Sequence, residues 1–495
     1  MFPQTPLRNV ALKSPALLGL ASQLQSQAQR SATSGGATAE PEAAPLNLPA
    51  QKTLTAAEQR ACFGPAATAG GSTPPPDDAD AAGRSEVRRR AWNLADRASG
   101  ITPSAVRSAL ARADPSSTPS FAGGLPSPQT MLIGPLARAC ERVLGRPDAH
   151  TALQYSATAG LRELREAVAA FLPWPVHPDQ VMITAGSQGA IFAVAVATLQ
   201  RGRKVVVETP TYLGALKAFQ AFEPDMVGVA CDEEGMLPAD LEAKIEGASL
   251  LYIQPNFQNP TGHCMSVERR EAITRIAARA GVLVLEDDAY GRLWFDGPPP
   301  PSLASYNPEN TMHAGSFSKF LALPGLRLAY LVVADPQIRA MLEMIKEVMD
   351  LQSSTLGQRL LIEVIRDGVM KTHLPHVRAH YKQNRDAMLA ALQREMDGLG
   401  VTWNRPAGGM FVWATLPRGM SASALLTRAL AMDVCFIPGR EFYATEPDDR
   451  TLRLSYATPN PEQIASGIAS LAKAVREMQE DARLAIAENE PQAVS

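Results

Sequence analysis

The sequence has few cysteines, no long apolar run and no excess of one charge. Its 495 residues include only five cysteines, and no two of them form a C-x-x-C pair. We expect reduced thiols in a cytoplasmic compartment, because disulfides persist mainly in oxidising ones. No run of about 18 apolar residues occurs, so a membrane-spanning helix is not expected. The 47 basic and 50 acidic residues give a net charge of −3, which implies no nucleic-acid partner.

The first 90 residues are poor in the branched and aromatic side chains from which a core is built. Residues 35–83 consist mostly of Ala, Pro, Gly, Thr and Glu and include three consecutive prolines. Such a segment buries too little apolar surface to offset the entropy that is lost on folding. We therefore expect residues 1–90 to be a disordered leader, whose Ser-rich and acid-free start resembles an organelle transit peptide.

Helical and strand-like runs alternate from about residue 140 onwards. Residues 160–172, 189–200 and 267–280 have the periodicity of helices. Short apolar runs of the kind found in buried strands lie at 181–184, 204–208, 250–254, 282–286 and 328–333. Continuous apolar strands that alternate with helices are typical of a parallel sheet covered on both faces. The predicted fold class is therefore α/β, with a mostly parallel sheet sandwiched by helices.

The pattern changes after about residue 345, where the chain becomes helical and then offers short strands at 410–413 and 452–455. We expect a smaller α+β domain there. The predicted segments are a leader (1–90), an N-terminal arm with part of the small domain (91–139), a large domain (140–345), the small domain (346–478) and a flexible acidic tail (479–495).

One lysine and one arginine lie eight positions apart across a Gly/Pro turn. Lys319 ends a Ser-Phe-Ser-Lys stretch, and Arg327 follows Pro-Gly-Leu. A lysine amine forms a Schiff base with a carbonyl cofactor, and a guanidinium holds a phosphate, with Ser316 and Ser318 as added hydroxyl donors. Apolar flanks would lower the pKa of Lys319 and favour its neutral, nucleophilic form. The alternative is a serine-capped turn whose Lys319 and Arg327 face water.

Three further motifs would contact such a cofactor. Residues 183–189 run from a strand into a helix, whose amides and whose Ser187 and Gln188 side chains would bind phosphate. Tyr212 would lay an aromatic face on a flat heterocycle, and Asn259 would donate to a phenolate-like oxygen. The alternatives are an ordinary strand-to-helix turn, a tyrosine at the rim of the core and a simple Asn-Pro turn.

Three consecutive carboxylates, from Glu286 to Asp288, end another predicted strand, and Tyr290 follows two residues later. One carboxylate would pair with a protonated ring nitrogen, and Tyr290 would hydrogen-bond a ring oxygen. Burial of an unpaired carboxylate costs too much for structure alone to favour it. The alternative is that all three acids lie beyond the end of the strand, in water.

The motifs at 183–189, Tyr212, Asn259 and Glu286 to Asp288 lie at the carboxyl ends of predicted strands, which is where open α/β sheets bind ligands. Together they supply what pyridoxal phosphate needs: a Schiff-base lysine, phosphate donors, a stacking ring and polar partners for the ring atoms. No metal site is predicted.

On these motifs, the sequence from about residue 92 to 473 resembles the fold-type I pyridoxal-phosphate aminotransferases of class I/II, in particular the 2-aminoadipate and kynurenine aminotransferases. The resemblance implies that Lys319, Asp287 and Tyr212 are catalytic, and that Asp287 rather than Asp288 pairs with the pyridine nitrogen. It also implies phosphate contacts from Ser187, Gln188, Ser316, Ser318 and Arg327, ring stacking by Tyr212, and O3′ contacts from Asn259 and Tyr290.

Four other positions match this family through their neighbours. Gly124, in Phe-Ala-Gly-Gly-Leu-Pro, resembles the segment that covers the substrate. Tyr155 resembles the tyrosine that reaches the neighbouring subunit's cofactor, which implies a homodimer. Arg453 matches the arginine that clamps the substrate α-carboxylate, and the resemblance also assigns Asn259 to substrate binding. Arg107 resembles a helix residue that contacts the substrate side chain, and its alternative is a solvated helix arginine.

The expected function is transfer of an amino group from an L-amino acid to a 2-oxo acid, with ping-pong kinetics. The donor would be 2-aminoadipate, an aromatic or branched amino acid, or a glutamate-like one. Two alternatives stay open. One is a lyase or decarboxylase on the same scaffold, because fold and cofactor do not fix the bond that is broken. The other is an aminotransferase-like transcription regulator. Residues 1–90 lack the helical periodicity that its DNA-binding domain would need, which argues against this alternative.

Overall fold

The computed structural model describes residues 95–99, 101, 103 and 119–489. The predicted leader and the helix around Arg107 lie outside these ranges. Every helix within them falls short of the length or the apolarity that crossing a bilayer requires.

The larger of the two described sheets has eight strands in the order β1-β8-β7-β6-β5-β2-β3-β4. Neighbours among β7, β6, β5, β2 and β3 run parallel, whereas β8 is antiparallel to both β1 and β7. The predicted α/β class is confirmed, with a sheet that is mixed because of β8 and β4. The bounds are β1 Val181–Thr184, β2 Lys204–Thr209, β3 Asp225–Asp232, β4 Gly235–Met236, β5 Ala248–Ile253, β6 Leu283–Asp288, β7 Thr311–Ser316 and β8 Ala329–Val332.

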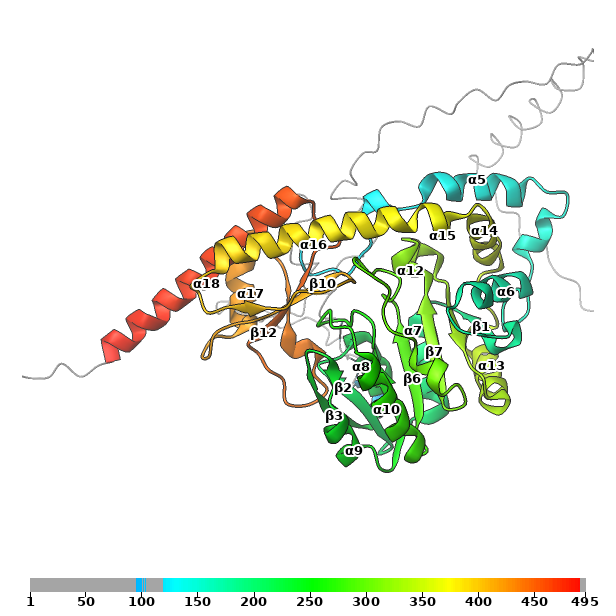
Figure 1. Cartoon of the computed structure of the whole chain (residues 1–495), viewed down its shortest axis with the longest axis horizontal. Helices are drawn as coiled ribbons and strands as arrows, with labels where there is room; N and C mark the ends of the chain where they lie inside the picture. Colours follow the sequence, from blue (N-terminus) through cyan, green and yellow to red (C-terminus); the bar gives the residue numbers. More distant parts are fainter. Residues whose placement is uncertain (1–94, 100, 102, 104–118, 490–495) are drawn as a thin grey trace, which may run out of the picture. The chain divides into compact units, whose positions relative to one another are not determined.

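Helices cover both faces of this sheet, which explains why its strands are apolar throughout. Val205 and Val207 of β2 pack into one core with α7 (Ser187–Thr198) and α8 (Leu213–Gln220). Val206, which points the opposite way, packs with α9 (Pro238–Lys244) and α10 (Val267–Arg279). Figure 1 shows α8 and α10 beside the strands β2 and β6.

The smaller sheet is antiparallel, with the strand order β11-β12-β10-β9. Helices α16 (Leu374–Met396) and α18 (Pro461–Asn489) pack against each other next to it, as Figure 1 shows. Helix α18 continues to Asn489, into the segment that was expected to be a flexible tail. The strand bounds are β9 Thr402–Trp403, β10 Phe411–Thr415, β11 Ile437–Pro438 and β12 Thr451–Ser455.

The stretch of chain between β8 and β9 forms several separate helices. Its sequence pattern predicts a single helix from 344 to 371. Leu351 adopts a φ of 57° and ends α13, and the Ser354 side chain accepts the N–H of Gly357 to begin α14. The other described helices are α3 Asp96–Ser99, α5 Ile133–Leu144, α6 Arg162–Phe171, α11 Leu303–Tyr306, α12 Phe317–Phe320, α13 Pro336–Asp350, α14 Thr355–Arg366, α15 Val369–Thr372 and α17 Ala422–Leu430.

The sequence patterns do not predict β3 or β7. Strand β7 is buried throughout although it contains Thr311, His313 and Ser316. His313 tolerates this position because its Nδ1 lies 3.2 Å from the buried Glu286 carboxylate. Strand β3 lies close to the sheet edge and exposes part of its length, so it lacks a continuous apolar run.

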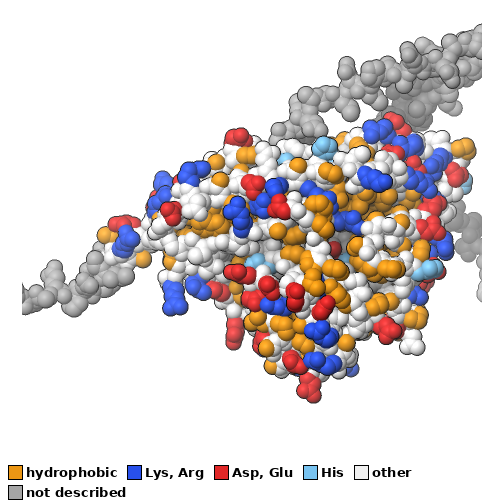
Figure 2. Space-filling view, viewed as in Figure 1, with side chains coloured by type: hydrophobic (Ala, Val, Ile, Leu, Met, Phe, Trp, Pro, Cys, Tyr) orange, Lys and Arg blue, Asp and Glu red, His pale blue; other side chains and the backbone are white. Residues whose placement is uncertain are grey.

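The surface carries charges of both signs. On the face drawn in Figure 2, Lys and Arg side chains are interspersed with Asp and Glu. Such a mixed field agrees with the near-neutral composition and offers no single-sign patch for a polyanion on that face.

Candidate functional site

Lys319 lies just beyond the end of β7, in the short helix α12. The Ser316 side chain accepts the N–H of Ser318 at 3.2 Å and so caps this helix. The Lys319 Nζ donates to the Gly124 carbonyl oxygen at 2.7 Å. Burial, with the positive charges of Arg453 and Arg327, lowers the pKa of Lys319 to about 8. Far more of the amine is therefore neutral near physiological pH than for an ordinary lysine, which favours its action as a nucleophile.

Arg327 lies against the first turn of α7. Gly186 precedes this helix with a φ of 77°, and a Cβ on it would lie 2.4 Å from Arg327 Nη2. Ser187 and Gln188 are the first residues of the helix, so its free N–H groups and the guanidinium share one corner. The Gln188 side chain also donates to the Gly214 carbonyl at 2.8 Å. This corner has the donors and the positive charge that a phosphate group needs.

Asp287 is buried at the end of β6, and only one of its carboxylate oxygens is paired. Tyr252 Oη donates to Oδ2 at 2.7 Å and Gln254 Nε2 donates to the same oxygen at 2.9 Å. Oδ1 has no partner. Burial raises the pKa of Asp287 to about 6 against the lowering effect of these two hydrogen bonds, so the ionised form prevails at neutral pH. A free, ionised Oδ1 is what a protonated ring nitrogen would bind.

The alternative that all three acids of this strand end lie in water is wrong. Glu286 is 0% exposed and Asp287 is 2% exposed, and they point to opposite faces of the sheet. Glu286 pairs with His313, and Ser302 also donates to it. Asp288 alone serves the turn, because its Oδ1 accepts the N–H of Gly291 at 2.7 Å.

Arg453 is buried in β12, although arginine on a strand is usually exposed. Its Nη1 donates to Asn259 Oδ1 at 2.7 Å and its Nη2 donates to the Ala122 carbonyl. The guanidinium carbon lies 4.3 Å from the Phe411 ring centroid and 5.0 Å from that of Phe442. Its Nε has no partner. Burial lowers the pKa of Arg453 to about 10, which still leaves it charged and ready to hold a carboxylate.

Two tyrosines complete the site. Burial and the Asp287 carboxylate raise the pKa of Tyr212 to about 12. Burial also raises the pKa of Tyr290, whose ring packs edge-on against Phe411 with centroids 5.7 Å apart. Both phenols therefore stay protonated at neutral pH and can donate a hydrogen bond.

These side chains fit pyridoxal phosphate. A poised amine, a phosphate corner, a free carboxylate oxygen and two phenol donors come from segments that lie far apart in the sequence. Their charges interact: Arg453 and Arg327 both act on Lys319 and Tyr212, and Asp287 acts on Tyr212 and Tyr290. Among the described residues, no group of three or more His, Cys, Asp and Glu side chains could hold a metal ion.

One predicted residue is not brought into this site within the described chain, and a second is not described. Tyr155 is 76% exposed, and its backbone N–H bonds only to the neighbouring Gln154 side chain. Arg107 lies outside the described residues. The roles of these two residues stay predictions, as do those of the residues that do converge.

Sequence reasoning missed Tyr252 and Gln254, which both donate to Asp287. They are two positions apart at the end of a strand, so their side chains lie on the same face. This spacing could have predicted that both contact the same group. It missed Phe411 and Phe442 as well, since aromatic rings that contact an arginine from other segments of the chain leave no local pattern.

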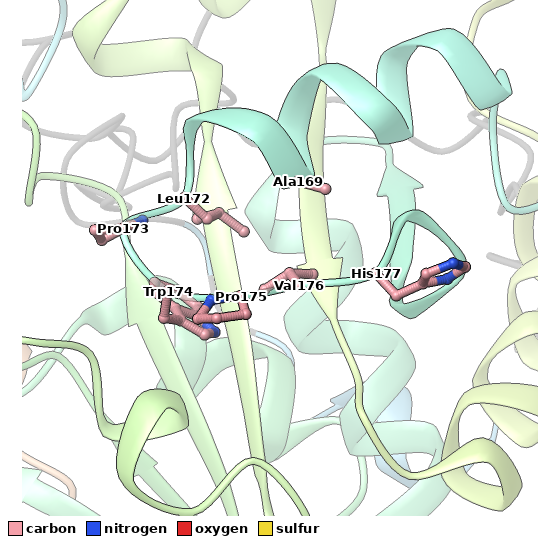
Figure 3. Close-up of a pocket in the computed structure, with 7 residues that line it drawn as sticks. All are labelled: Ala169, Leu172, Pro173, Trp174, Pro175, Val176 and His177. Carbon is pink, nitrogen blue, oxygen red and sulfur yellow. The ribbon is translucent and has the colours of Figure 1, made fainter.

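A surface pocket lies elsewhere, lined by Ala169 and residues 172–177 (Figure 3). None of the predicted site residues lines it. Trp174 packs edge-on against His313 from here, with ring centroids 4.9 Å apart. The pocket therefore adjoins the buried His313 through Trp174.

The comparisons with known proteins agree with this geometry. The family model described as aminotransferase class I and II matches residues 129–471. The chain belongs to this family. The match covers both sheets and nearly all of the predicted site, and pyridoxal 5′-phosphate is accordingly the cofactor of this aminotransferase.

Its relatives include aminotransferases for acidic and aromatic substrates. Aromatic-amino-acid aminotransferase 1 of Thermococcus litoralis is 36% identical over 396 residues, covering 78% of this chain and 94% of its own. The structure of an alpha-aminoadipate aminotransferase from Thermus thermophilus, complexed with N-(5′-phosphopyridoxyl)-L-leucine, is 38% identical with a TM-score of 0.73 and covers 78% and 98%. A Pyrococcus horikoshii kynurenine aminotransferase in complex with PMP is 35% identical with a TM-score of 0.74 and covers 78% and 97%. The predicted resemblance is confirmed.

The lowered pKa of Lys319 predicts how cofactor attachment depends on pH. When cofactor-free aminotransferase is mixed with pyridoxal phosphate, the rate should rise with pH and level off above about 8, because only the neutral amine attacks. Stopped-flow absorbance measures this rate. Since Arg453 lowers this pKa, Arg453→Ala should move the midpoint to higher pH. A wild-type midpoint near 10.5, the ordinary lysine value, would contradict the assignment.

Proposed function

We propose that this aminotransferase moves the amino group of an L-amino acid with an acidic, aromatic or branched side chain to a 2-oxo acid. The observation that carries the proposal is that the buried amine of Lys319 lies near enough to the buried Arg453 for the arginine charge to lower its pKa, while the Arg453 Nε has no partner. One group acts at the amino acid's α-carbon and the other binds its α-carboxylate. The names of the relatives, which include aminoadipate, aromatic and kynurenine aminotransferases, support the range of side chains.

Each residue has a defined task in the proposed reaction. The bound cofactor supplies an electron sink for the broken Cα–H bond. Lys319, freed by the incoming amino acid, takes the α-proton as general base, for which its pKa of about 8 suits it. Asp287 stays ionised and holds a proton on the ring nitrogen through its free Oδ1. Tyr212 and Tyr290 donate as neutral phenols.

The reaction would run in two halves, with the oxo acid of the first leaving before the second binds. A lyase or decarboxylase would use the same Lys319 and Asp287. Product analysis distinguishes them, because transamination yields one oxo acid for each amino acid consumed. Release of ammonia or carbon dioxide in that stoichiometry would contradict the proposal.

A panel of amino donors against 2-oxoglutarate and pyruvate tests the substrate range. We expect turnover with 2-aminoadipate and aromatic donors, followed by absorbance of the cofactor. In the same panel, Arg107→Ala should weaken turnover of 2-aminoadipate and glutamate more than that of leucine, because a distal carboxylate would lose its charged partner. Equal losses on all donors would remove Arg107 from the site.

We also propose that the enzyme is a homodimer in which Tyr155 of the partner subunit completes each site. Large apolar side chains are exposed on two segments, Leu153 (70%) two residues before Tyr155, and Val348 (90%) and Leu351 (53%) at the end of α13. The two segments adjoin, since the Ser156 N–H donates to Gln352 Oε1 at 3.1 Å. Exposed apolar side chains on adjoining segments are typical of protein interfaces.

Val348→Glu is expected to convert the dimer into a monomer, because it buries a charge in an apolar interface. Light scattering after gel filtration measures the mass, and the monomer should also bind pyridoxal phosphate more weakly. Leu484→Glu, at a 54% exposed position of α18, is the matched control and should remain dimeric. A dimeric Val348→Glu enzyme would exclude this face.

The compartment is proposed to be the cytoplasm. Cys140, Cys231 and Cys264 carry free thiols, as a reducing compartment would keep them.

A further inference from the structure

Gln254 lies at the centre of the polar network and is itself 3% exposed. It directly follows β5 and makes three hydrogen bonds. Its Nε2 donates to Asp287 Oδ2 at 2.9 Å, and its Oε1 accepts the backbone N–H of Asn259 at 3.2 Å. Its own backbone N–H donates to Glu208 Oε2 at 2.8 Å. One side chain thus touches two separate parts of the site.

The orientation of this amide follows from its neighbours. An ionised carboxylate only accepts hydrogen bonds and a backbone N–H only donates. A flipped amide would place oxygen against the Asp287 carboxylate and NH₂ against the Asn259 N–H. Both contacts would then be repulsive, so a single orientation satisfies the network.

The second arm of the network reaches the substrate arginine. Asn259 Oδ1 accepts a hydrogen bond from Arg453 Nη1 at 2.7 Å. A continuous chain of hydrogen bonds therefore runs from Asp287 through Gln254 and Asn259 to Arg453. Its ends are the carboxylate for the cofactor ring and the guanidinium for the substrate carboxylate.

We propose that Gln254 is a positioning residue. It holds the Asp287 carboxylate, which would bind the ring nitrogen, and the Arg453 guanidinium, which would bind the substrate carboxylate, in a fixed position relative to each other. The proposal rests on the roles proposed above for Asp287 and Arg453. Because Gln254 and Tyr252 both donate to Oδ2, they fix the carboxylate plane and leave Oδ1 free for the ring. Because Gln254 also fixes the backbone of Asn259, it sets where the partner of Arg453 lies.

Tyr252 offers an internal comparison. Its hydroxyl donates to the same Asp287 oxygen at 2.7 Å, but no described hydrogen bond joins it to Asn259 or Arg453. Loss of the Tyr252 hydroxyl should disturb the cofactor alone, whereas loss of the Gln254 amide should disturb the cofactor and the substrate carboxylate together. This difference separates coupling through Gln254 from a general loosening of the site.

The experiment compares Gln254→Met, which keeps the side-chain length and removes both polar atoms, with Tyr252→Phe. Gln254→Asn, which is one methylene shorter and still polar, serves if the Met variant does not fold. Gln358→Met is the control, since Gln358 is 0% exposed and binds Leu161 N–H and Ser353 O, and no described hydrogen bond joins it to Asp287, Asn259 or Arg453. The measurements are the cofactor absorbance band, the Kd of pyridoxal phosphate, and kcat and KM for the best donor of the panel.

For the Gln254 variants we expect a shifted band, a Kd about 10-fold higher and a KM about 10-fold higher, as for lost hydrogen bonds to charged groups. Tyr252→Phe should shift the band and raise Kd with KM within about two-fold, and Gln358→Met should leave all three within about two-fold. Equal KM values for the Gln254 and Tyr252 variants would overturn the proposal. Asp287→Asn tests the underlying role separately: an unchanged band in that variant would overturn the cofactor assignment, and the coupling with it.

Discussion

Replacing Lys319 with alanine is expected to lower kcat by a factor on the order of 10⁴, the largest effect of any single substitution in this enzyme. In the proposed reaction the side chain has two tasks, covalent anchorage of the cofactor and removal of the α-proton, and alanine performs neither. The surroundings of Lys319 favour the neutral amine, because burial and the charges of Arg453 and Arg327 lower its pKa to about 8. Steady-state kinetics with the best donor of the panel measures the loss.

Two further variants test the cause of this loss. Lys319→Arg keeps a positive charge but cannot deprotonate at working pH, so it should be as inactive as the alanine variant. Lys382→Ala removes a surface lysine that pairs with Asp296 and should keep full activity. A Lys319→Ala enzyme that retained a tenth of wild-type activity would contradict the assigned role.

Arg453→Ala is expected to reduce kcat/KM by about 30-fold to several thousand-fold for every amino donor. This corresponds to a loss of about 2–5 kcal/mol of transition-state stabilisation. The loss should not depend on the donor's side chain, because the α-carboxylate is common to all of them. Two partners are also left incomplete, since Asn259 Oδ1 and the Ala122 carbonyl both accept from this guanidinium. The donor panel, repeated with the variant, measures the effect.

Arg450→Ala is the matched control for this prediction. Arg450 lies three residues earlier, is 40% exposed in its side chain and pairs with Asp448 on the surface. It should change kcat/KM by less than about two-fold, because exposed ion pairs contribute little. Unchanged turnover in Arg453→Ala across the panel would refute the carboxylate clamp.

Much of the large sheet follows from sequence, because its strands are buried on both faces. The run at 181–184 coincides with β1, and the runs at 204–208, 250–254 and 282–286 end within two residues of β2, β5 and β6. Strand β7 was not predicted because it contains polar residues, which are paired with residues on other elements, as His313 is with Glu286. Such pairing depends on the sheet order, which periodicity does not encode.

The site was predictable as a set of strand ends, but not as a network. Lys319 contacts Gly124 and Arg453 pairs with Asn259, and these contacts join residues up to 195 positions apart. The free oxygen of Asp287 likewise depends on how separate segments meet. Sequence spacing alone does not reveal such contacts. The choice of Asp287 over Asp288 came from the family resemblance, and the structure supplies its physical basis in burial and in the donors Tyr252 and Gln254.

The most direct test of the account is to locate the cofactor on the chain. The enzyme carrying pyridoxal phosphate would be reduced with borohydride, which makes the lysine linkage permanent, then digested and analysed by mass spectrometry. The account predicts one modified peptide with the pyridoxyl-phosphate mass on Lys319, absent from Lys319→Arg. Modification of a different lysine, or of none in an enzyme that turns over amino acids, would contradict it.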